Sequence, residues 1–123
     1  MVLLDATVLI DFLNDVLPAV EFMGSMDPED TALSSVTLAE VLVGCNPAEQ
    51  ERVLLLSQKF HFLDIDKEVV ISAARLRREY GWKLPDAFQA ALALRHKLTF
   101  VTRNTKDFNP AVHKFVKIPY RLR

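Results

Sequence analysis

The chain of 123 residues has little of several residue types, and each shortage excludes a class of protein. A single cysteine, Cys45, excludes an internal disulfide, and no spacing of cysteine and histidine suggests a zinc site. The three glycines are isolated, which excludes a glycine-rich phosphate loop. No apolar run approaches the roughly 20 residues that span a bilayer, and an acid at Asp5 argues against a signal peptide. We therefore expect a cytoplasmic protein with no membrane partner.

The positive and negative charges nearly cancel over the whole chain, but they are distributed unevenly along it. The formal net charge is −1, yet residues 1–60 carry ten acidic and two basic side chains, and residues 61–123 carry six acidic and thirteen basic ones. Such a split is typical of a protein with a polyanion partner, unless the fold mixes the two halves on one neutral surface. The content of 50% hydrophobic and 25% charged residues predicts one globular domain over residues 1–123.

The stretch from Leu84 to Phe108 indicates a helix, a tight turn, a short strand and a polar loop. Its apolar residues first recur at helical spacing, and the run at 98–101 then suits a buried strand. A helix followed so closely by a strand is half of a β-α-β unit, and sites form beyond the carboxyl ends of parallel strands. Asn104 and Asp107 fall in that position, and Asp86 opens the preceding helix.

The remaining pattern alternates short strands with helices. Strands are predicted at 2–5, 31–34, 62–65, 98–101 and 114–118, and helices at 6–13, 17–23, 35–43, 47–59, 67–80 and from about 86 to 94. This order predicts an α/β fold whose mostly parallel sheet of four or five strands is covered by helices on both faces. Right-handed crossovers then place the carboxyl ends of the strands at one edge.

Four carboxylates are candidates for a site at that edge: Asp5, Glu40, Asp86 and Asp107. Clustered oxygen ligands suit Mg²⁺ or Mn²⁺, and a divalent cation removes the repulsion that several carboxylates in one place would feel. Each acid taken alone has a structural alternative. Asp5 is placed to cap a helix, and Glu40 fits a capping box that begins at Thr37. Asp86 suits a helix start, and Asp107 an ordinary turn.

Other polar and aromatic residues are better explained by structure than by function. Asp11 is expected on a solvated helix face. Trp82, Phe60 and Phe62 are expected in the core rather than as platforms for nucleobases. The three histidines have no nucleophile nearby in sequence, so the pattern does not support a catalytic triad.

Four motifs in series resemble the PIN domain family, and within it the VapC-type toxins of toxin–antitoxin systems. They are LLDATVLIDFL, SSVTLAEVLVG, LPDAFQAALAL and FVTRNTKDF, and together they span almost the whole chain. The resemblance implies a three-layer α/β/α sandwich and a Mg²⁺- or Mn²⁺-dependent endoribonuclease. It also implies a small antitoxin partner and a homodimer, for which Leu13, Leu17 and Phe22 are the expected apolar contact surface.

The resemblance also assigns site residues. Asp5, Glu40 and Asp86 match the three acidic positions of the family. Asp107 matches a fourth in the closing TRN-x-x-D-F motif, while Asn104 stands where some members carry an aspartate. Thr7 takes the place of a small polar residue beside the first acid.

The four acids would accordingly be both metal ligands and catalytic residues, with Thr7 and Asn104 in support. Ala6 departs from the family pattern, in which a threonine is common. Three basic residues flank the acids as candidate contacts to RNA phosphates, with solvated charge as the alternative: Lys83, Arg103 and Lys106. Two other functions remain open. One is a non-catalytic module that binds RNA or protein, and the other is a phosphatase with Asp5 as nucleophile, although Thr7 stands where such enzymes usually have a second acid.

Overall fold

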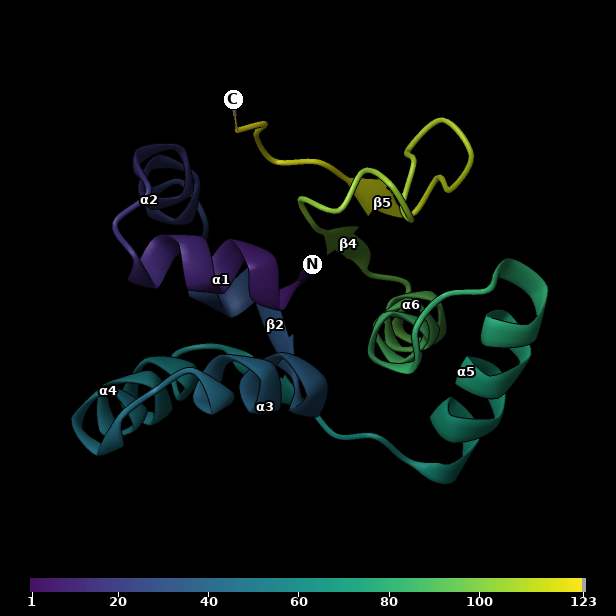
Figure 1. The fold of residues 1–123 in the computed structure, drawn as a ribbon, viewed down its shortest axis with the longest axis horizontal. Coiled ribbons are helices and arrows are strands. Elements are labelled where there is room, and N and C mark those ends of the chain that lie inside the picture. The colour runs from purple at the N-terminus through teal and green to yellow at the C-terminus, as the bar shows by residue number, and fades with distance from the viewer. Residues whose placement is uncertain (123) are drawn as a thin grey trace.

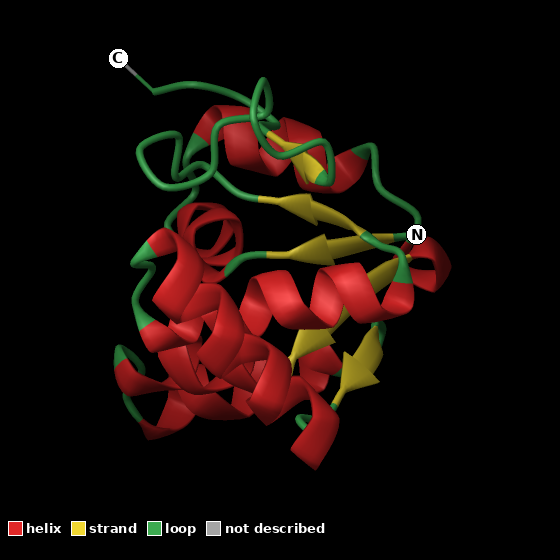
Figure 2. Ribbon diagram, turned by 90° about the vertical axis from the view of Figure 1, so that its right-hand side faces the viewer, coloured by secondary structure: helices red, strands yellow, loops and turns green. Residues whose placement is uncertain are grey.

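A computed structural model describes residues 1–122 and contains five strands. They are β1 (Val2–Leu4), β2 (Thr31–Ser34), β3 (His61–Leu63), β4 (Thr99–Val101) and β5 (Val116–Lys117). All of them pair in parallel, in the order β3-β2-β1-β4-β5. Figure 2 shows the strands side by side with helices packed around them. The predicted parallel α/β fold is therefore confirmed, with five strands.

Six α-helices and one short 3₁₀ helix connect the strands. They are α1 (Ala6–Leu13), α2 (Leu17–Gly24), η1 (Pro28–Asp30), α3 (Ser35–Val43), α4 (Pro47–Ser57), α5 (Lys67–Tyr80) and α6 (Leu84–His96). Helices α1 to α4 lie on one side of the sheet, and α5 and α6 on the other (Figure 1). Within residues 1–122, no helix is long and apolar enough to cross a membrane.

Alternation along the strands explains the three layers. Successive strand residues point to opposite faces of a sheet. Leu3 and Phe100 pack with α5 and α6 on one face, whereas Leu4 and Val101 pack with α1, α3 and α4 on the other. Each of these four side chains has an exposed fraction of 0%. The two apolar faces therefore explain why these strands are continuous apolar runs rather than alternating ones.

Local signals set the ends of the helices that matter for the site. Asp5 is the N-cap of α1, and Ser34 is the N-cap of α3. Helix α5 ends at Gly81, whose φ of 75° lies in the left-handed region that glycine adopts without strain. Only Trp82 and Lys83 then separate Gly81 from Leu84, the first residue of α6, so the start of α6 is held close to the end of α5.

Several sequence-based boundaries and burials were wrong. Strand β3 begins at His61 and ends at Leu63, earlier than predicted, because it pairs with β2 from Ala32 to Ser34. It is an edge strand, so Phe62 is 46% exposed rather than in the core. Phe22 does not join an exposed patch, since it is partly buried and packs edge-on against Tyr120, with the two ring centroids 6.4 Å apart.

Candidate active site

Asp5 lies at the carboxyl end of β1 and is held by three hydrogen bonds. Its Oδ1 accepts from the Ala6 amide at 2.8 Å. Its Oδ2 accepts from the hydroxyls of Thr102 at 2.7 Å and Thr7 at 3.1 Å. The Asp5 amide also donates to the Val101 carbonyl at 2.9 Å, which joins the ends of β1 and β4. The buried Asp5 carboxylate therefore caps α1 and is also fixed in orientation at the sheet edge.

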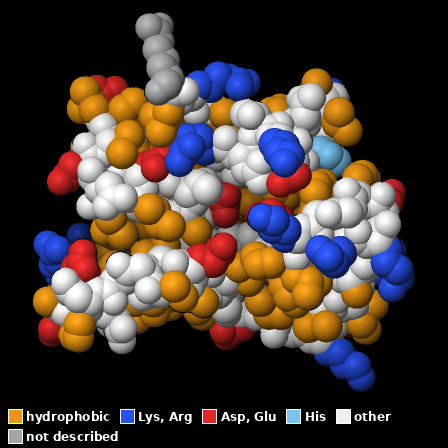
Figure 3. Space-filling view, viewed as in Figure 1, with side chains coloured by type: hydrophobic (Ala, Val, Ile, Leu, Met, Phe, Trp, Pro, Cys, Tyr) orange, Lys and Arg blue, Asp and Glu red, His pale blue; other side chains and the backbone are white. Residues whose placement is uncertain are grey.

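Glu40 and Asp86 interact electrostatically with Asp5, and Asp107 interacts with Asp86. Burial and the charges of Asp5 and Asp107 together raise the pKa of Asp86 to about 6, against the opposing charge of Lys83. Partial desolvation of its carboxyl group raises the pKa of Glu40, and so do the charges of Asp5 and Asp86. We call these four residues, Asp5, Glu40, Asp86 and Asp107, the acidic cluster. Figure 3 shows acidic atoms around a hollow near the middle of one face of the molecule, with basic atoms beside them.

Glu40 is not part of a capping box. The side chain that caps α3 belongs to Ser34, whose Oγ accepts from the Thr37 amide at 3.0 Å. Thr37 is therefore the third helical residue, and Glu40 lies one turn further along α3, with an exposed side chain. The structural alternative for Glu40 was wrong, because the cap lies three residues earlier than the sequence pattern suggested.

Asn104 orients Asp107. The Asn104 Nδ2 donates to Asp107 Oδ2 at 3.0 Å, and the Asp107 amide donates back to Asn104 Oδ1 at 3.2 Å. The Asn104 amide donates to Thr102 Oγ1 at 3.1 Å, and the Trp82 indole donates to the Asp107 carbonyl at 3.1 Å. Both polar atoms of the Asn104 side-chain amide thus form hydrogen bonds with Asp107. One of the two carboxylate oxygens of Asp107 accepts from this amide.

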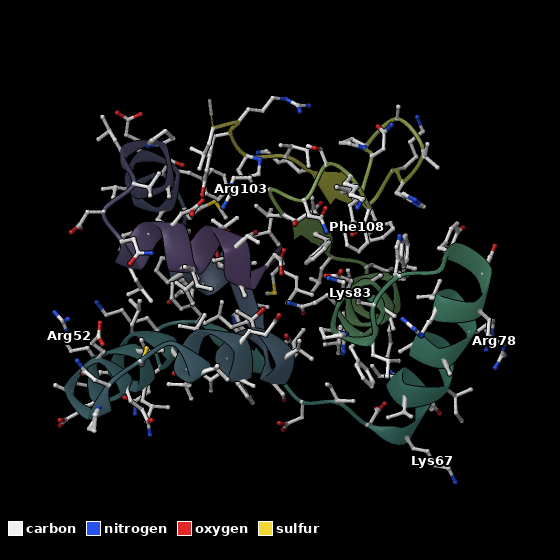
Figure 4. The ribbon with its side chains drawn as sticks, in the orientation of Figure 1. Arg52, Lys67, Arg78, Lys83, Arg103 and Phe108 are labelled. Atoms are coloured by element: carbon white, nitrogen blue, oxygen red, sulfur yellow. The ribbon has the colours of Figure 1, made fainter. Side chains whose placement is uncertain are left out.

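Arg103 does not face solvent as a free cation. Its Nε and Nη2 donate to the two carboxylate oxygens of Asp11 at 2.7 and 3.1 Å, and the Tyr120 hydroxyl donates to Asp11 Oδ2 at 2.9 Å. Asp11 is buried, so its expected solvated position was wrong. Figure 4 labels Arg103 near α1 and Lys83 near the start of α6. Lys83 and Lys106 are exposed, and they remain the better candidates for phosphate contacts.

Sequence reasoning missed Thr102, which donates the shortest hydrogen bond to Asp5. Thr102 is fully buried and follows β4 directly. The position of Thr102 in the sequence could have indicated this role, because it lies between the buried strand β4 and Asn104. A hydroxyl at the carboxyl end of one parallel strand can reach the carboxyl end of the neighbouring strand. Trp82 is buried as expected, and its indole additionally ties the Asp107 loop to the α5–α6 connection.

The raised pKa of Asp86 predicts a pH-dependent stability in the absence of metal. Between its ordinary value of 3.8 and about 6, the folded state keeps a proton that the unfolded state has lost. The contribution of Asp86 to the free energy of unfolding should therefore fall as the pH rises from about 4 to about 6. Chemical denaturation in EDTA across this range measures it. The free energy of unfolding of Asp86→Asn, relative to that of wild type, should rise as the pH increases from about 4 to about 6. A difference that stays constant over this pH range would contradict a raised pKa of Asp86.

The donor set fits a hydrated divalent cation. Among residues 1–122, no three acidic, histidine or cysteine side chains are close enough to ligate one ion together. Mg²⁺ commonly binds through one or two carboxylates and keeps several waters, so remaining carboxylates can act through those waters. Carboxylates that raise one another's pKa also gain most from a bound cation. The acidic cluster is therefore suited to a hydrated Mg²⁺ or Mn²⁺ ion.

The carboxylates gather at the edge of the parallel sheet where its strands have their carboxyl ends. This arrangement defines a class of α/β proteins whose functional site lies beyond the strand ends. Within that class, residues 2–111 match the model of the PIN domain. Because this match covers most of the chain, the protein belongs to the PIN domain family. The family predicted from the four sequence motifs is confirmed. No match was found among curated protein sequences.

Solved structures support the same assignment. The chain is similar to a toxin–antitoxin complex from Klebsiella pneumoniae, with 33% identity over 99% of this chain and 100% of that one and a TM-score of 0.88. It is also similar to FitAB bound to the IR36 DNA fragment, with 28% identity over 100% and 98% of the chains and a TM-score of 0.83. VapBC2 from Rickettsia felis, bound to a DNA fragment from its promoter, shares the fold at 20% identity, covering 88% and 91%, with a TM-score of 0.73.

Proposed function

We propose that the protein is a cytoplasmic endoribonuclease that depends on Mg²⁺ or Mn²⁺ and acts as the toxin of a toxin–antitoxin pair. The observation that carries the proposal is the acidic cluster at the carboxyl edge of the sheet, where four carboxylates influence one another. Membership of the PIN domain family supports the nuclease activity. The similarity to a toxin–antitoxin complex supports the biological role.

The side chains divide the work between holding the cation and holding the RNA. Asp5, Glu40, Asp86 and Asp107 would bind the cation, directly or through water. When bound, the cation supplies positive charge to the phosphoryl oxygens and lowers the pKa of water into the nucleophile range. Thr7 and Thr102 keep the Asp5 carboxylate in one orientation through their hydroxyls.

Two exposed lysines complete the proposed mechanism. Lys83 precedes α6, and its positive charge opposes the rise in the pKa of Asp86, so it lies beside the acidic cluster. Lys106 immediately precedes Asp107. Their ammonium groups would hold the RNA phosphates against the carboxylates, whose negative charge alone would repel a polyanion. This arrangement would place the scissile phosphodiester over the bound cation.

The test is RNA cleavage with and without Mn²⁺, comparing wild type with Asp86→Ala. Wild type should cleave only with the metal, and Asp86→Ala should be inactive while remaining folded. Glu51→Ala is a matched control, because Glu51 is an exposed acid on α4 outside the acidic cluster. Metal-independent cleavage by wild type, or full activity of Asp86→Ala, would contradict the proposal.

The closing loop allows a prediction about its two polar residues. Asp107→Asn should weaken Mn²⁺ binding more than Asn104→Ala does, because a carboxylate adds a full charge to the attraction for a divalent ion. Asn104 should act by orienting Asp107, to which its amide donates. Mn²⁺ titration of the two variants compares them. A larger loss in Asn104→Ala would reverse the assignment.

We expect a homodimer that binds a small antitoxin. Leu13 and Leu17 are 38% and 65% exposed at the end of α1 and the start of α2, and exposed apolar side chains that gather in this way mark contact surfaces. Light scattering should give twice the monomer mass, and Leu17→Glu should lower it. A monomer at high concentration would contradict the dimer without affecting the nuclease proposal.

A further inference from the structure

A closed network of hydrogen bonds lies buried between α3 and α6. Its members are Ser34, Thr37 and Gln89, and each has an exposed fraction of 0%. The Ser34 hydroxyl donates to Gln89 Oε1 at 2.6 Å, and Gln89 Nε2 donates to Thr37 Oγ1 at 2.5 Å. The Thr37 amide donates to Ser34 Oγ at 3.0 Å, which closes the ring. We call these three residues the Gln89 network.

The Gln89 network also reaches β1. The Thr37 hydroxyl donates to the Leu4 carbonyl at 3.0 Å. Leu4 is the last residue of β1, and the next residue is Asp5. The same cluster of side chains therefore joins the start of α3, the middle of α6 and the end of β1 in one hydrogen-bonded unit.

Three of the four residues of the acidic cluster, Asp5, Glu40 and Asp86, lie within three residues of a member of this unit in the sequence. Asp86 precedes Gln89 by three residues on α6, and Glu40 follows Thr37 by three residues on α3. Residues three apart share a face of a helix and are displaced by about 4.5 Å along its axis. Asp86 and Glu40 thus lie one turn away from the network on their two helices, and Asp5 is bonded directly to Leu4.

A buried glutamine needs an explanation, because apolar side chains would also fill the space between two helices. Apolar packing is not directional, so two helices held by it can slide by a fraction of a turn. A closed ring of hydrogen bonds has one geometry, since a shifted register would leave buried donors unsatisfied. An amide also adds no charge next to three carboxylates, whereas a glutamate would increase their repulsion.

We infer that Gln89 is a positioning residue that sets the separation of Asp5, Glu40 and Asp86 for one hydrated divalent cation. The inference rests on the proposed metal-dependent function. Gln89 touches neither the ion nor the RNA, and it acts through the helices that carry Asp86 and Glu40. Side chains that hydrogen-bond directly to metal ligands typically change metal affinity by about 10–100-fold when they are removed, and we expect the effect of Gln89, which is transmitted by two helices, to fall in that range.

The first test is Mn²⁺ affinity, measured from the electron paramagnetic resonance signal of the free ion. Gln89→Leu keeps a side chain of similar size and removes both hydrogen bonds, and it should bind Mn²⁺ about 10–100-fold more weakly than wild type. Leu92→Val is the matched control, since Leu92 is fully buried on α6 outside the network. It should lower the unfolding temperature and leave Mn²⁺ affinity unchanged.

A second pair of variants covers the case in which Gln89→Leu fails to fold. Thr37→Val removes the hydroxyl that serves both Gln89 and Leu4, whereas Thr37→Ser keeps it. Thr37→Val should lose Mn²⁺ affinity, and Thr37→Ser should retain it. If Gln89 acts through Asp86, Gln89→Leu should also cause a smaller loss of affinity in an Asp86→Asn background than in wild type.

The outcomes separate this inference from the proposed function. If wild type binds Mn²⁺ and cleaves RNA while Gln89→Leu and Thr37→Val bind Mn²⁺ as tightly as wild type, the positioning role is overturned and the nuclease stands. Equal losses of affinity in Leu92→Val and Gln89→Leu would also overturn it, because general destabilisation would then explain both. If wild type neither binds Mn²⁺ nor cleaves RNA, the proposed function fails and the positioning role fails with it.

Discussion

Asp5→Asn should abolish metal-dependent RNA cleavage and leave the metal-free fold at least as stable as that of wild type. Asparagine caps a helix as well as aspartate does, so the hydrogen bond from the Ala6 amide is kept. The hydroxyl oxygens of Thr7 and Thr102 each accept from one backbone amide and have a second lone pair that can accept from the amide nitrogen that replaces Oδ2. The substitution also removes one of the charges that raise the pKa values of Glu40 and Asp86.

The rate of RNA cleavage by Asp5→Asn should fall by at least about 100-fold, which is the scale of losing one strong electrostatic contact. Thermal unfolding in EDTA measures the stability, and single-turnover cleavage in saturating Mn²⁺ measures the rate. Asp27→Asn is a suitable control, because Asp27 is an exposed N-cap at the start of η1, remote in the sequence from every acid of the cluster. Normal cleavage by Asp5→Asn would mean that Asp5 is only a helix cap.

Glu40→Gln should lower the cleavage rate by about 100-fold with no loss of stability. The cap of α3 is Ser34, so no backbone amide depends on the Glu40 carboxylate as its capping partner. Partial desolvation and the charges of Asp5 and Asp86 raise the pKa of Glu40, and a neutral amide relieves the repulsion between these charges. The metal-free variant should therefore unfold at the same temperature as wild type or slightly above it.

Calorimetry in EDTA and a cleavage assay in Mn²⁺ test the two halves of this prediction. Glu49→Ala provides the contrast, because it removes a side chain that does serve a capping box, in which the Glu49 carboxylate accepts from the Asn46 amide at 3.0 Å. That variant should affect only stability. A Glu40 variant that melts earlier and cleaves normally would show that Glu40 has a structural role alone.

The sequence predicted the arrangement at the sheet edge better than it predicted the partners of each side chain. Apolar strands of the right length and helices between them were sufficient to place Asp5 and the loop after β4 at one edge. The parallel pairing of β1 with β4 brings them together there. The predicted strand boundaries were less accurate where the local sequence pattern is weak. Strand β3 is an example, because a strand at the edge of the sheet needs fewer apolar residues.

Pairings between distant residues were beyond sequence reasoning. Thr102 and Asp5 are 97 residues apart, and Arg103 and Asp11 are 92 apart. Local patterns cannot show that a threonine or an arginine will meet a given carboxylate across the sheet. The same limit hid the role of Gln89, which lies within an apolar helical pattern and meets its partners more than 50 residues away, at separations of 52 and 55.

Trp82 has a practical consequence for experiments on this protein. It is the only tryptophan in the chain, it is 4% exposed, and its indole nitrogen donates to the Asp107 carbonyl at 3.1 Å. The rings of Tyr80 and His113 lie against it, with centroids 4.5 and 5.1 Å away. When the protein is excited at wavelengths that tyrosine does not absorb, its fluorescence therefore originates from this one tryptophan, which is hydrogen-bonded to the loop that carries Asp107. A change in that loop, on binding of an ion, an RNA or a protein, would alter the emission of this one ring, so the chain contains its own label-free optical probe.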